Sequence, residues 1–369
     1  MNVFDLESPA FLIDAARLER NSSLMLERAK KLGVRLRPHL KTHKSVEIAR
    51  IQLGGREGPV TVSTLAEAGF FLEAGFKDIT YAVPISPQKL ASVRTLAEKS
   101  SAFNILLDSE EAADAVERAG KARGVRLSVF LKVDCGYHRA GVDPLLNESR
   151  TLAERLEDSK WIDFKGILTH AGQSYHAHSQ DEIQDVAEVE RSRMVQFGQL
   201  LRSAGIDCPE ISVGSTPTAV HARCLEGVTE IRPGNYIFFD KFQADIGTCS
   251  YEDCAVSVLT RIMGVYPEEK KLLVDAGALA LSKDPGAVHI VGETVFGLVL
   301  EHPNLRVTGL SQEHGTVLGD TEKDVSRFRV GDALRILPNH SCLAAALHPW
   351  YFLVDGEQVV DRFQPVRGW

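Results

Sequence analysis

The chain has 369 residues, of which 44% are hydrophobic, and it carries a formal net charge of −8. A chain of this length buries a large core and exceeds the roughly 250–300 residues at which a second domain becomes usual. Because it is acidic and lacks a basic tail or an arginine-rich block, we expect no nucleic-acid partner.

No apolar run approaches the roughly 20 residues that are needed to span a bilayer, so we expect no membrane partner. The first five residues are acidic and lack the apolar core of an export signal, which predicts a cytoplasmic protein. None of the six cysteines forms a Cys-x-x-Cys pair, and we expect most of them to be small buried hydrophobes.

Short apolar strands alternate with helices through the first two thirds of the chain. A strand at 9–13 precedes a helix at about 15–32, and the alternation continues with strands at 34–37, 60–62, 79–83, 103–107, 126–133, 164–169, 210–213 and 229–232. The eight units from residue 34 onward predict parallel strands with crossover helices in a closed (β/α)8 TIM barrel, an α/β fold. An open doubly wound sheet is the alternative, but it would normally show a glycine-rich turn after its first strand.

The pattern changes after about Gly234, where short Val- and Leu-rich strands alternate with glycine turns. We expect strands at 256–265, 271–274, 288–300, 316–317 and 333–336, which predict an all-β second domain. We therefore assign residues 9–240 to the barrel and residues 241–369, together with 1–8, to the β domain, because a sheet often holds the chain ends.

In a parallel barrel the active site lies at the carboxyl ends of the strands, so the residues that follow each strand are candidates. Taken individually, each of these residues is explained equally well as an ordinary loop residue with no role in the active site. The candidates delivered by this rule are His39 and Lys41, then Arg139, His170 and Tyr175, then Gly214, Ser215 and Thr216, and finally Gly234, Asn235 and Tyr236.

Residues 37–44 read Arg-Pro-His-Leu-Lys-Thr-His-Lys, a cationic turn between a strand and a helix. Such a turn is commonly a solvated loop. Alternatively, a lysine near a second cation and partly desolvated has a lowered pKa and can form a Schiff base. Lys41 is the better candidate because it is nearer the strand end, whereas Lys44 begins the helix and faces solvent or a substrate carboxylate.

Gly214, Ser215 and Thr216 lie between a strand and a helix, where small residues expose backbone N–H groups and hydroxyls to an anion. The loops after strands seven and eight of this barrel type frequently bind phosphate, and Gly234 and Asn235 follow strand eight. A phosphate cradle opposite a strand-one lysine suggests pyridoxal phosphate, which needs both groups.

His340 and Cys342 alternate by two in the second domain. On an extended segment this spacing places both side chains on one face, where they can bind one metal ion. Imidazole with thiolate favours zinc, with manganese or magnesium as alternatives. A buried cysteine beside a surface histidine is the competing interpretation, and His348 is a further candidate ligand.

Four segments together resemble the D-serine dehydratase and D-threonine aldolase family, which are alanine-racemase-like enzymes of fold type III. The resemblance runs in order along nearly the whole chain. It is carried by residues 37–44, by Gly-Ser-Thr-Pro-Thr at 214–218, by Arg-Pro-Gly-Asn-Tyr at 232–236 and by Pro-Asn-His-Ser-Cys at 338–342.

The resemblance implies a pyridoxal phosphate enzyme that acts on a small D-amino acid as a homodimer with its site near the interface. It implies that Lys41 holds the cofactor, that Arg139 and Tyr175 lie near its ring, and that its phosphate contacts Ser215, Thr216, Gly234 and Asn235. His-x-Cys resembles the zinc-dependent D-serine and 3-hydroxyaspartate dehydratases, whereas the aldolases resemble His-x-Asp.

We therefore expect a metal-dependent lyase that converts a D-β-hydroxy amino acid, such as D-serine or D-3-hydroxyaspartate, to a keto acid and ammonia. Retro-aldol cleavage of D-threonine to glycine and an aldehyde is the alternative on the same fold. A non-catalytic pyridoxal phosphate protein is the alternative from another class, although such proteins resemble a barrel without a β domain.

Overall fold

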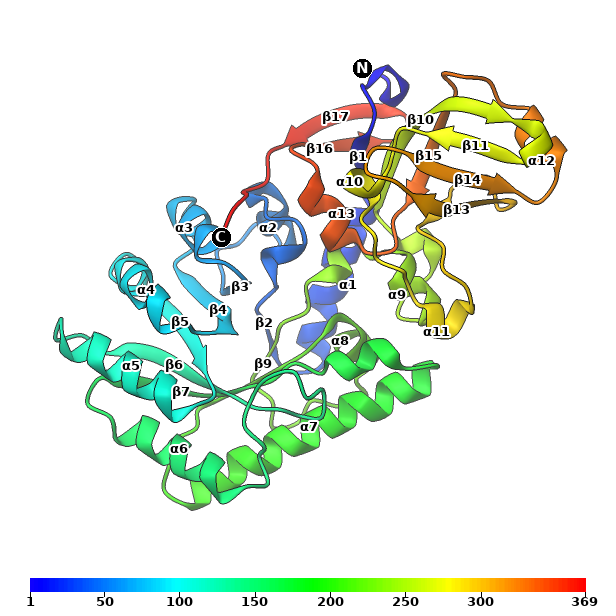
Figure 1. Cartoon of the computed structure of the whole chain (residues 1–369). Coiled ribbons are helices and arrows are strands. Elements are labelled where there is room, and N and C mark those ends of the chain that lie inside the picture. Colours follow the sequence, from blue (N-terminus) through cyan, green and yellow to red (C-terminus); the bar gives the residue numbers. More distant parts are fainter. The chain divides into compact units, whose positions relative to one another are not determined.

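The structure is a computed structural model that describes residues 1–369, and the chain divides into two compact units (Figure 1). The β unit comprises Met1–Ser23 and Asn235–Pro365, and the barrel unit comprises Leu24–Gly234 and Val366–Trp369. No helix combines the length and the apolar character that crossing a membrane requires.

The barrel unit contains one parallel sheet of eight strands in the order β2-β9-β8-β7-β6-β5-β4-β3. A parallel bridge between His39 and Thr61 joins the two end strands, with the Thr61 amide donating to the Pro38 carbonyl at 2.9 Å. The strands are β2 (Arg35–Leu36), β3 (Val60–Val62), β4 (Asp78–Pro84), β5 (Ala102–Leu107), β6 (Leu127–Lys132), β7 (Ile162–Leu168), β8 (Glu210–Val213) and β9 (Glu230–Ile231).

A helix follows every strand of this sheet except the last. Several of the helices begin at a Ser or Thr whose side chain accepts the first free backbone N–H, as at Ser45, Thr64, Ser109 and Ser179. The helices are α2 (Val46–Gln52), α3 (Leu65–Glu73), α4 (Leu90–Ala97), α5 (Glu110–Lys121), α6 (Asn147–Asp158), α7 (Gln180–Ser203) and α8 (Thr216–His221).

A buried ion-pair network fastens the seam between β2 and β9. Glu230 accepts from Arg37 Nε at 2.9 Å and from Ser212 Oγ at 2.6 Å, and Arg37 also donates to Asp78 at 2.6 Å. Arg37 and Glu230 are both buried. The arginine that opens the cationic turn is therefore a structural residue, because removing either partner would leave a buried charge unpaired.

The β unit is built on one nine-stranded sheet in the order β11-β14-β13-β12-β15-β10-β1-β16-β17. An additional β10–β11 pairing closes six of these strands into an antiparallel barrel. The strands are β1 (Ala10–Asp14), β10 (Val256–Tyr266), β11 (Lys271–Val274), β12 (Leu298–Val299), β13 (Leu305–Leu310), β14 (Gly315–Gly319), β15 (Ala333–Leu337), β16 (Tyr351–Asp355) and β17 (Gln358–Phe363).

Short helices connect these strands, and the unit boundary falls inside a long one. They are α9 (Lys241–Asp245), α10 (Ala278–Leu281), α11 (Val288–Val291), α12 (Glu322–Ser326) and α13 (Ser341–Leu347), and the boundary lies within α1 (Ala15–Lys31). The predicted fold class, a TIM-like α/β barrel followed by an all-β domain, is confirmed.

Two local expectations differ from the structure. The strand predicted at 9–13 exists as β1, but it pairs with β10 and β16, so residues 9–23 group with the β unit and not with the barrel. The strand predicted at 288–300 is the short helix α11 followed by β12 alone. Gly292 ends α11 with a left-handed φ of +81°. A Cβ on Gly297 would lie 2.6 Å from Ile336, so this position requires glycine. These two glycines interrupt the apolar segment that was predicted as one strand.

Candidate functional site

Lys41 is the exposed residue of a tight turn directly after β2. It lies in the 3-10 helix η2 (Leu40–Thr42), and the ring nitrogen Nδ1 of His39 accepts the Lys41 backbone N–H at 3.4 Å. The Lys41 side chain forms no ion pair and no side-chain hydrogen bond, whereas its charge acts on the rings of His39 and His170. Its amine is therefore available for chemistry.

Lys44, the competing lysine, is committed to the fold. Its Nζ lies 3.0 Å from Oε1 of Glu67, whose carboxylate is buried, and its backbone adopts a left-handed φ of 55°. The expectation that Lys44 faces solvent or a substrate carboxylate is therefore wrong, because an ion pair to a buried acid holds its ammonium.

His170, Tyr137 and Tyr175 form a ring cluster after strands β6 and β7. The ring centroids of His170 lie 6.1 Å from Tyr137 and 6.4 Å from Tyr175, and Arg139 stacks over Tyr137 at 5.1 Å. His170 Nδ1 lies 3.2 Å from the Gly214 carbonyl, which makes Nδ1 the protonated nitrogen and leaves Nε2 as an acceptor.

Both histidines beside Lys41 are held in the neutral form. Burial, and then the charges of Lys41 and Arg232, hold the pKa of His39 well below its usual value. Burial, and then Lys41, Lys132 and Arg139, do the same to the pKa of His170. The two imidazoles therefore add no positive charge next to the candidate nucleophile.

The Gly214 loop presents hydroxyls on a tightly fixed backbone. Ser215 caps α8, and its Oγ lies 2.9 Å from Ser174 Oγ and 3.1 Å from Thr218 Oγ1. Gly214 has φ +120°, and a Cβ there would lie 3.0 Å from the Arg232 amide nitrogen. A set of hydroxyls at a glycine turn suits a phosphate group, so the residues present fit the phosphate of pyridoxal phosphate.

Glu190 of α7 holds this loop from behind. Its Oε1 accepts the backbone N–H of Gly214 at 2.9 Å and that of Ala171 at 3.1 Å. Burial, against these hydrogen bonds, raises the pKa of this fully buried carboxyl. Glu190 thus fixes the loops after β7 and β8 in one arrangement, although it also occupies the Gly214 N–H that a phosphate would otherwise use.

Three residues predicted to bind the cofactor, two of them at its phosphate, have structural roles instead. A Cβ on Gly234 would lie 2.8 Å from the His39 carbonyl oxygen, so the close approach of two loops requires this glycine. The Asn235 side chain instead donates to Asp240 Oδ2 at 2.6 Å and to Ser341 Oγ at 3.0 Å, and Tyr236 is buried within the same 3-10 helix. The amide of Asn235 is therefore committed within the β unit.

Sequence reasoning placed Arg232 after strand eight without giving it a role, and it did not select Lys132. Arg232 is buried, donates to Val213 O at 3.2 Å and also bonds Ser212 Oγ and Thr169 O, and burial lowers its pKa to about 10. Lys132 ends β6 and is buried, which lowers its pKa to about 8. For Lys132, the available signal was a cation at the carboxyl end of a mostly apolar strand.

Acid is expected to destabilise the barrel unit through His43. Its Nδ1 accepts the Ser45 amide at 3.0 Å and its Nε2 faces Gln52 Oε1 at 2.9 Å, and burial lowers its pKa to about 4. Because the unfolded imidazole titrates near 6.5, the unfolded chain binds the extra proton between about pH 6.5 and 4. The free energy of unfolding should fall by up to about 1.4 kcal/mol per pH unit across that window as pH decreases.

Urea denaturation at pH 7, 6, 5 and 4.5 measures this slope. His43→Gln should reduce this slope by the contribution of one proton, because buried His39 and His170 still contribute, whereas His178→Gln, at an exposed position, should leave it unchanged. Equal slopes in all three proteins would contradict the assignment to His43.

His340 and Cys342 are in contact in the β unit, though not on an extended segment as predicted. His340 precedes α13 and Cys342 lies in its first turn. Burial opposes protonation, but hydrogen bonds to Asp284 and Cys342 raise the pKa of His340 well above its usual value. The spacing therefore brings the two groups together through a helix start.

An imidazole and a thiol in contact are a donor set that fits a zinc ion. No group of three His, Cys, Asp or Glu side chains with metal-binding geometry occurs in the chain, so protein atoms would fill only part of a coordination shell. The buried Oδ1 of Asn235, whose Nδ2 lies 3.8 Å from Cys342 Sγ, lacks a hydrogen-bond partner.

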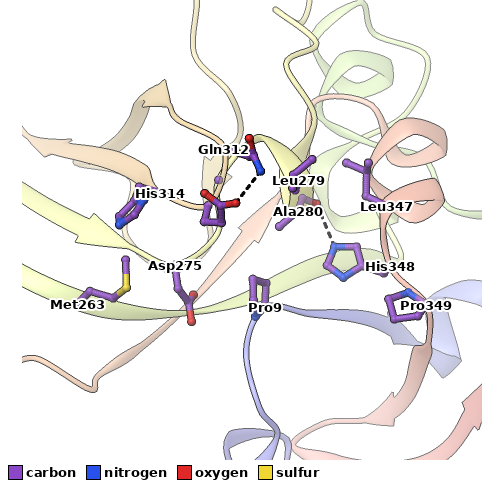
Figure 2. Close-up of a pocket in the computed structure, with 12 residues that line it drawn as sticks. Pro9, Met263, Asp275, Leu279, Ala280, Gln312, His314, Leu347, His348 and Pro349 are labelled. Atoms are coloured by element: carbon purple, nitrogen blue, oxygen red, sulfur yellow. Dashed lines mark hydrogen bonds between the residues drawn. The ribbon is translucent and has the colours of Figure 1, made fainter.

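His348, the further candidate ligand, serves a different place. Its Nε2 lies 3.0 Å from the Ala280 carbonyl oxygen and its ring packs 5.5 Å from Phe11. Figure 2 shows it in the wall of a pocket of about 430 Å³ that Pro9, Met263 and Leu347 also line. His348 is thus bound to a backbone carbonyl of the β unit.

Comparison with known proteins follows the same two-part division. Residues 13–241 match the family described as alanine racemase, N-terminal domain, and residues 255–354 match a serine dehydratase domain. The barrel and the β unit are thus the two parts of an alanine-racemase-like protein.

Relatives match this chain from end to end. D-serine dehydratase of Dictyostelium discoideum is 38% identical and covers 100% of this chain and 98% of its own length. D-threo-3-hydroxyaspartate dehydratase of Delftia sp. is 39% identical over 99% of this chain and 98% of its own length. A solved structure of that enzyme has a TM-score of 0.95, with 38% identity over 100% of both chains.

D-threonine aldolase of Arthrobacter sp. is more distant, at 29% identity over 96% of this chain and 89% of its own length. The chain belongs to the D-serine dehydratase and D-threonine aldolase family of lyases. The resemblance that the four motifs indicated is therefore confirmed.

Proposed function

We propose that this chain is a pyridoxal-phosphate- and metal-dependent lyase that converts a D-β-hydroxy amino acid to a keto acid and ammonia. The observation that carries the proposal is full-length identity of 38–39% to two proteins that are both named as dehydratases. The His-x-Cys pair at 340 and 342 supports the same branch. D-serine and D-threo-3-hydroxyaspartate are the proposed substrates.

The proposed cofactor residues come from the barrel unit. Lys41 would hold the cofactor, Ser215 and Thr216 would bind its phosphate, and Arg139, His170 and Tyr175 would lie near its ring. When bound, pyridoxal phosphate supplies an electron-accepting ring that stabilises negative charge at the substrate Cα.

Lys41 Nζ is the proposed base that takes the Cα proton. Its amine is exposed and carries no ion pair that would have to break, whereas Lys44 is paired to Glu67. In the neutral form, His39 and His170 would accept or donate hydrogen bonds near the Lys41 amine without adding positive charge.

His340 and Cys342 are the proposed metal ligands, with zinc preferred over manganese and magnesium. A divalent ion there would supply Lewis acidity toward a substrate hydroxyl, and its unfilled positions leave room for that group. From the resemblance we also propose a homodimer, which light scattering on the purified protein tests.

A panel assay tests the function. Purified protein with pyridoxal phosphate and zinc is incubated with D-serine, D-threo-3-hydroxyaspartate and D-threonine, and keto acid, ammonia and glycine are measured. We expect keto acid and ammonia in equal amounts from at least one of the first two, with little glycine from D-threonine. Glycine and aldehyde as the main products would establish the aldolase instead, and no product from any substrate would favour a non-catalytic protein.

A further inference from the structure

Asp284 contacts the side chain of His340, and no role in the reaction accounts for it. We infer that Asp284 is a positioning residue that orients His340 for metal binding. The inference rests on the proposed metal site. Its carboxylate oxygen Oδ2 lies 3.1 Å from His340 Nδ1, with the Asp284 side chain 19% exposed.

The contact decides which ring nitrogen is free. A carboxylate acceptor at Nδ1 requires the proton there, so the lone pair of His340 lies on Nε2. Metal-bound histidines almost always donate their other N–H to a carboxylate, carbonyl or water, which fixes the ring and raises its basicity. The Asp284–His340 pair has this arrangement.

Asp284 is itself held in place by the segment that follows it. Its Oδ1 accepts the Gly286 amide at 2.9 Å, and Gly286 adopts φ +74°. The Asp284 carbonyl accepts Asn339 Nδ2 at 2.8 Å, and a Cβ on Gly286 would lie 2.9 Å from that amide nitrogen. The loop that carries the carboxylate is therefore fastened to the residue directly before His340.

A second carboxylate holds the other side of the same segment without touching an imidazole. Asp240 Oδ2 accepts the Ser341 amide at 2.9 Å and Ser341 Oγ at 3.1 Å. Asp240 is buried and bonds backbone, hydroxyl and side-chain amide groups, so it fixes the path of the chain. Asp284 instead bonds the ring of His340, the proposed metal ligand. Asp284 therefore orients the ligand, whereas Asp240 fixes the loop.

Metal affinity, measured without substrate, tests the inference. Zinc is titrated against a chromophoric chelator with the wild-type protein and with Asp284→Ala, Asp284→Asn and His340→Ala. We expect Asp284→Ala to bind zinc about 10- to 100-fold more weakly. Asp284→Asn should lose less, because its amide oxygen still accepts from Nδ1, and His340→Ala should lose the site.

Asp275→Asn is the matched control, because this hydrogen-bonded carboxylate lies in the same β unit, where it accepts from the hydroxyls of Ser8 and Thr260, but shares no hydrogen bond with residues 338–342. Wild-type affinity in Asp284→Ala and Asp284→Asn, with loss in His340→Ala, would overturn the positioning role and leave the metal site standing. Wild-type affinity in His340→Ala would overturn the metal site itself. An equal loss in Asp275→Asn would assign the effect to general loosening and overturn the inference.

Discussion

Lys41→Ala is expected to abolish the imine absorbance of bound pyridoxal phosphate and to reduce lyase activity by at least about 10³-fold. The variant removes both the amine that would hold the cofactor and the proposed base at Cα, and a positioned base alone contributes about 10²–10⁴-fold. Absorbance spectra of the reconstituted protein and keto acid formation from D-serine measure the two effects. The fold should survive, because the side chain is exposed.

Lys44→Met is the matched control three residues away. Lys44 is paired with Glu67 at 3.0 Å, so its loss should lower stability and leave the imine absorbance in place. The lysine assignment fails if the absorbance persists in Lys41→Ala and disappears in Lys44→Met.

The barrel was predictable because its signals are local. Eight short apolar strands, each followed by a helical pattern, leave few arrangements, and parallel strands deliver their following loops to one end. This rule selected Lys41, His170 and the Gly214 loop, which all follow strands in the structure. The loop residues carry chemistry that a strand pattern alone does not specify: the lysine after strand one and the Gly214 loop suggested the cofactor, and the four motifs added the family resemblance.

The errors arose where tertiary pairing overrides local pattern. The strand at 9–13 falls within the predicted bounds of the barrel domain, but its partners β10 and β16 lie some 240 and 340 residues further along the chain. Such long-range pairing leaves no periodic signal near β1 itself. The segment at 288–300 is apolar, yet its glycines adopt conformations that interrupt a strand.

The roles of residues that become buried in the fold could not be predicted from the sequence either. Asn235 follows strand eight as a phosphate residue should, but Asp240 and Ser341 bind its amide. Arg232 is charged in sequence and buried in the structure, where it donates to Ser212 and Val213. Whether a polar side chain faces a ligand or a neighbouring loop is decided by partners that are distant in sequence.

The thiol of Cys342 is expected to decide whether the protein holds metal. Cys342→Ala leaves the imidazole of His340 as the single proposed ligand, so bound zinc and lyase activity should both fall by at least about 10²-fold. Metal content after dialysis and keto acid formation measure the loss.

Cys342→Asp separates the ligand from the chain around it. A carboxylate also binds divalent ions and reproduces the His-x-Asp pattern that the aldolases resemble, so this variant should retain metal and shift preference toward manganese or magnesium. Its imine absorbance, and that of Cys342→Ala, should match the wild type, because Lys41 lies in the other unit and is unchanged. Full activity in Cys342→Ala, or in strong chelator, would remove the metal from the reaction while leaving the lysine assignment intact.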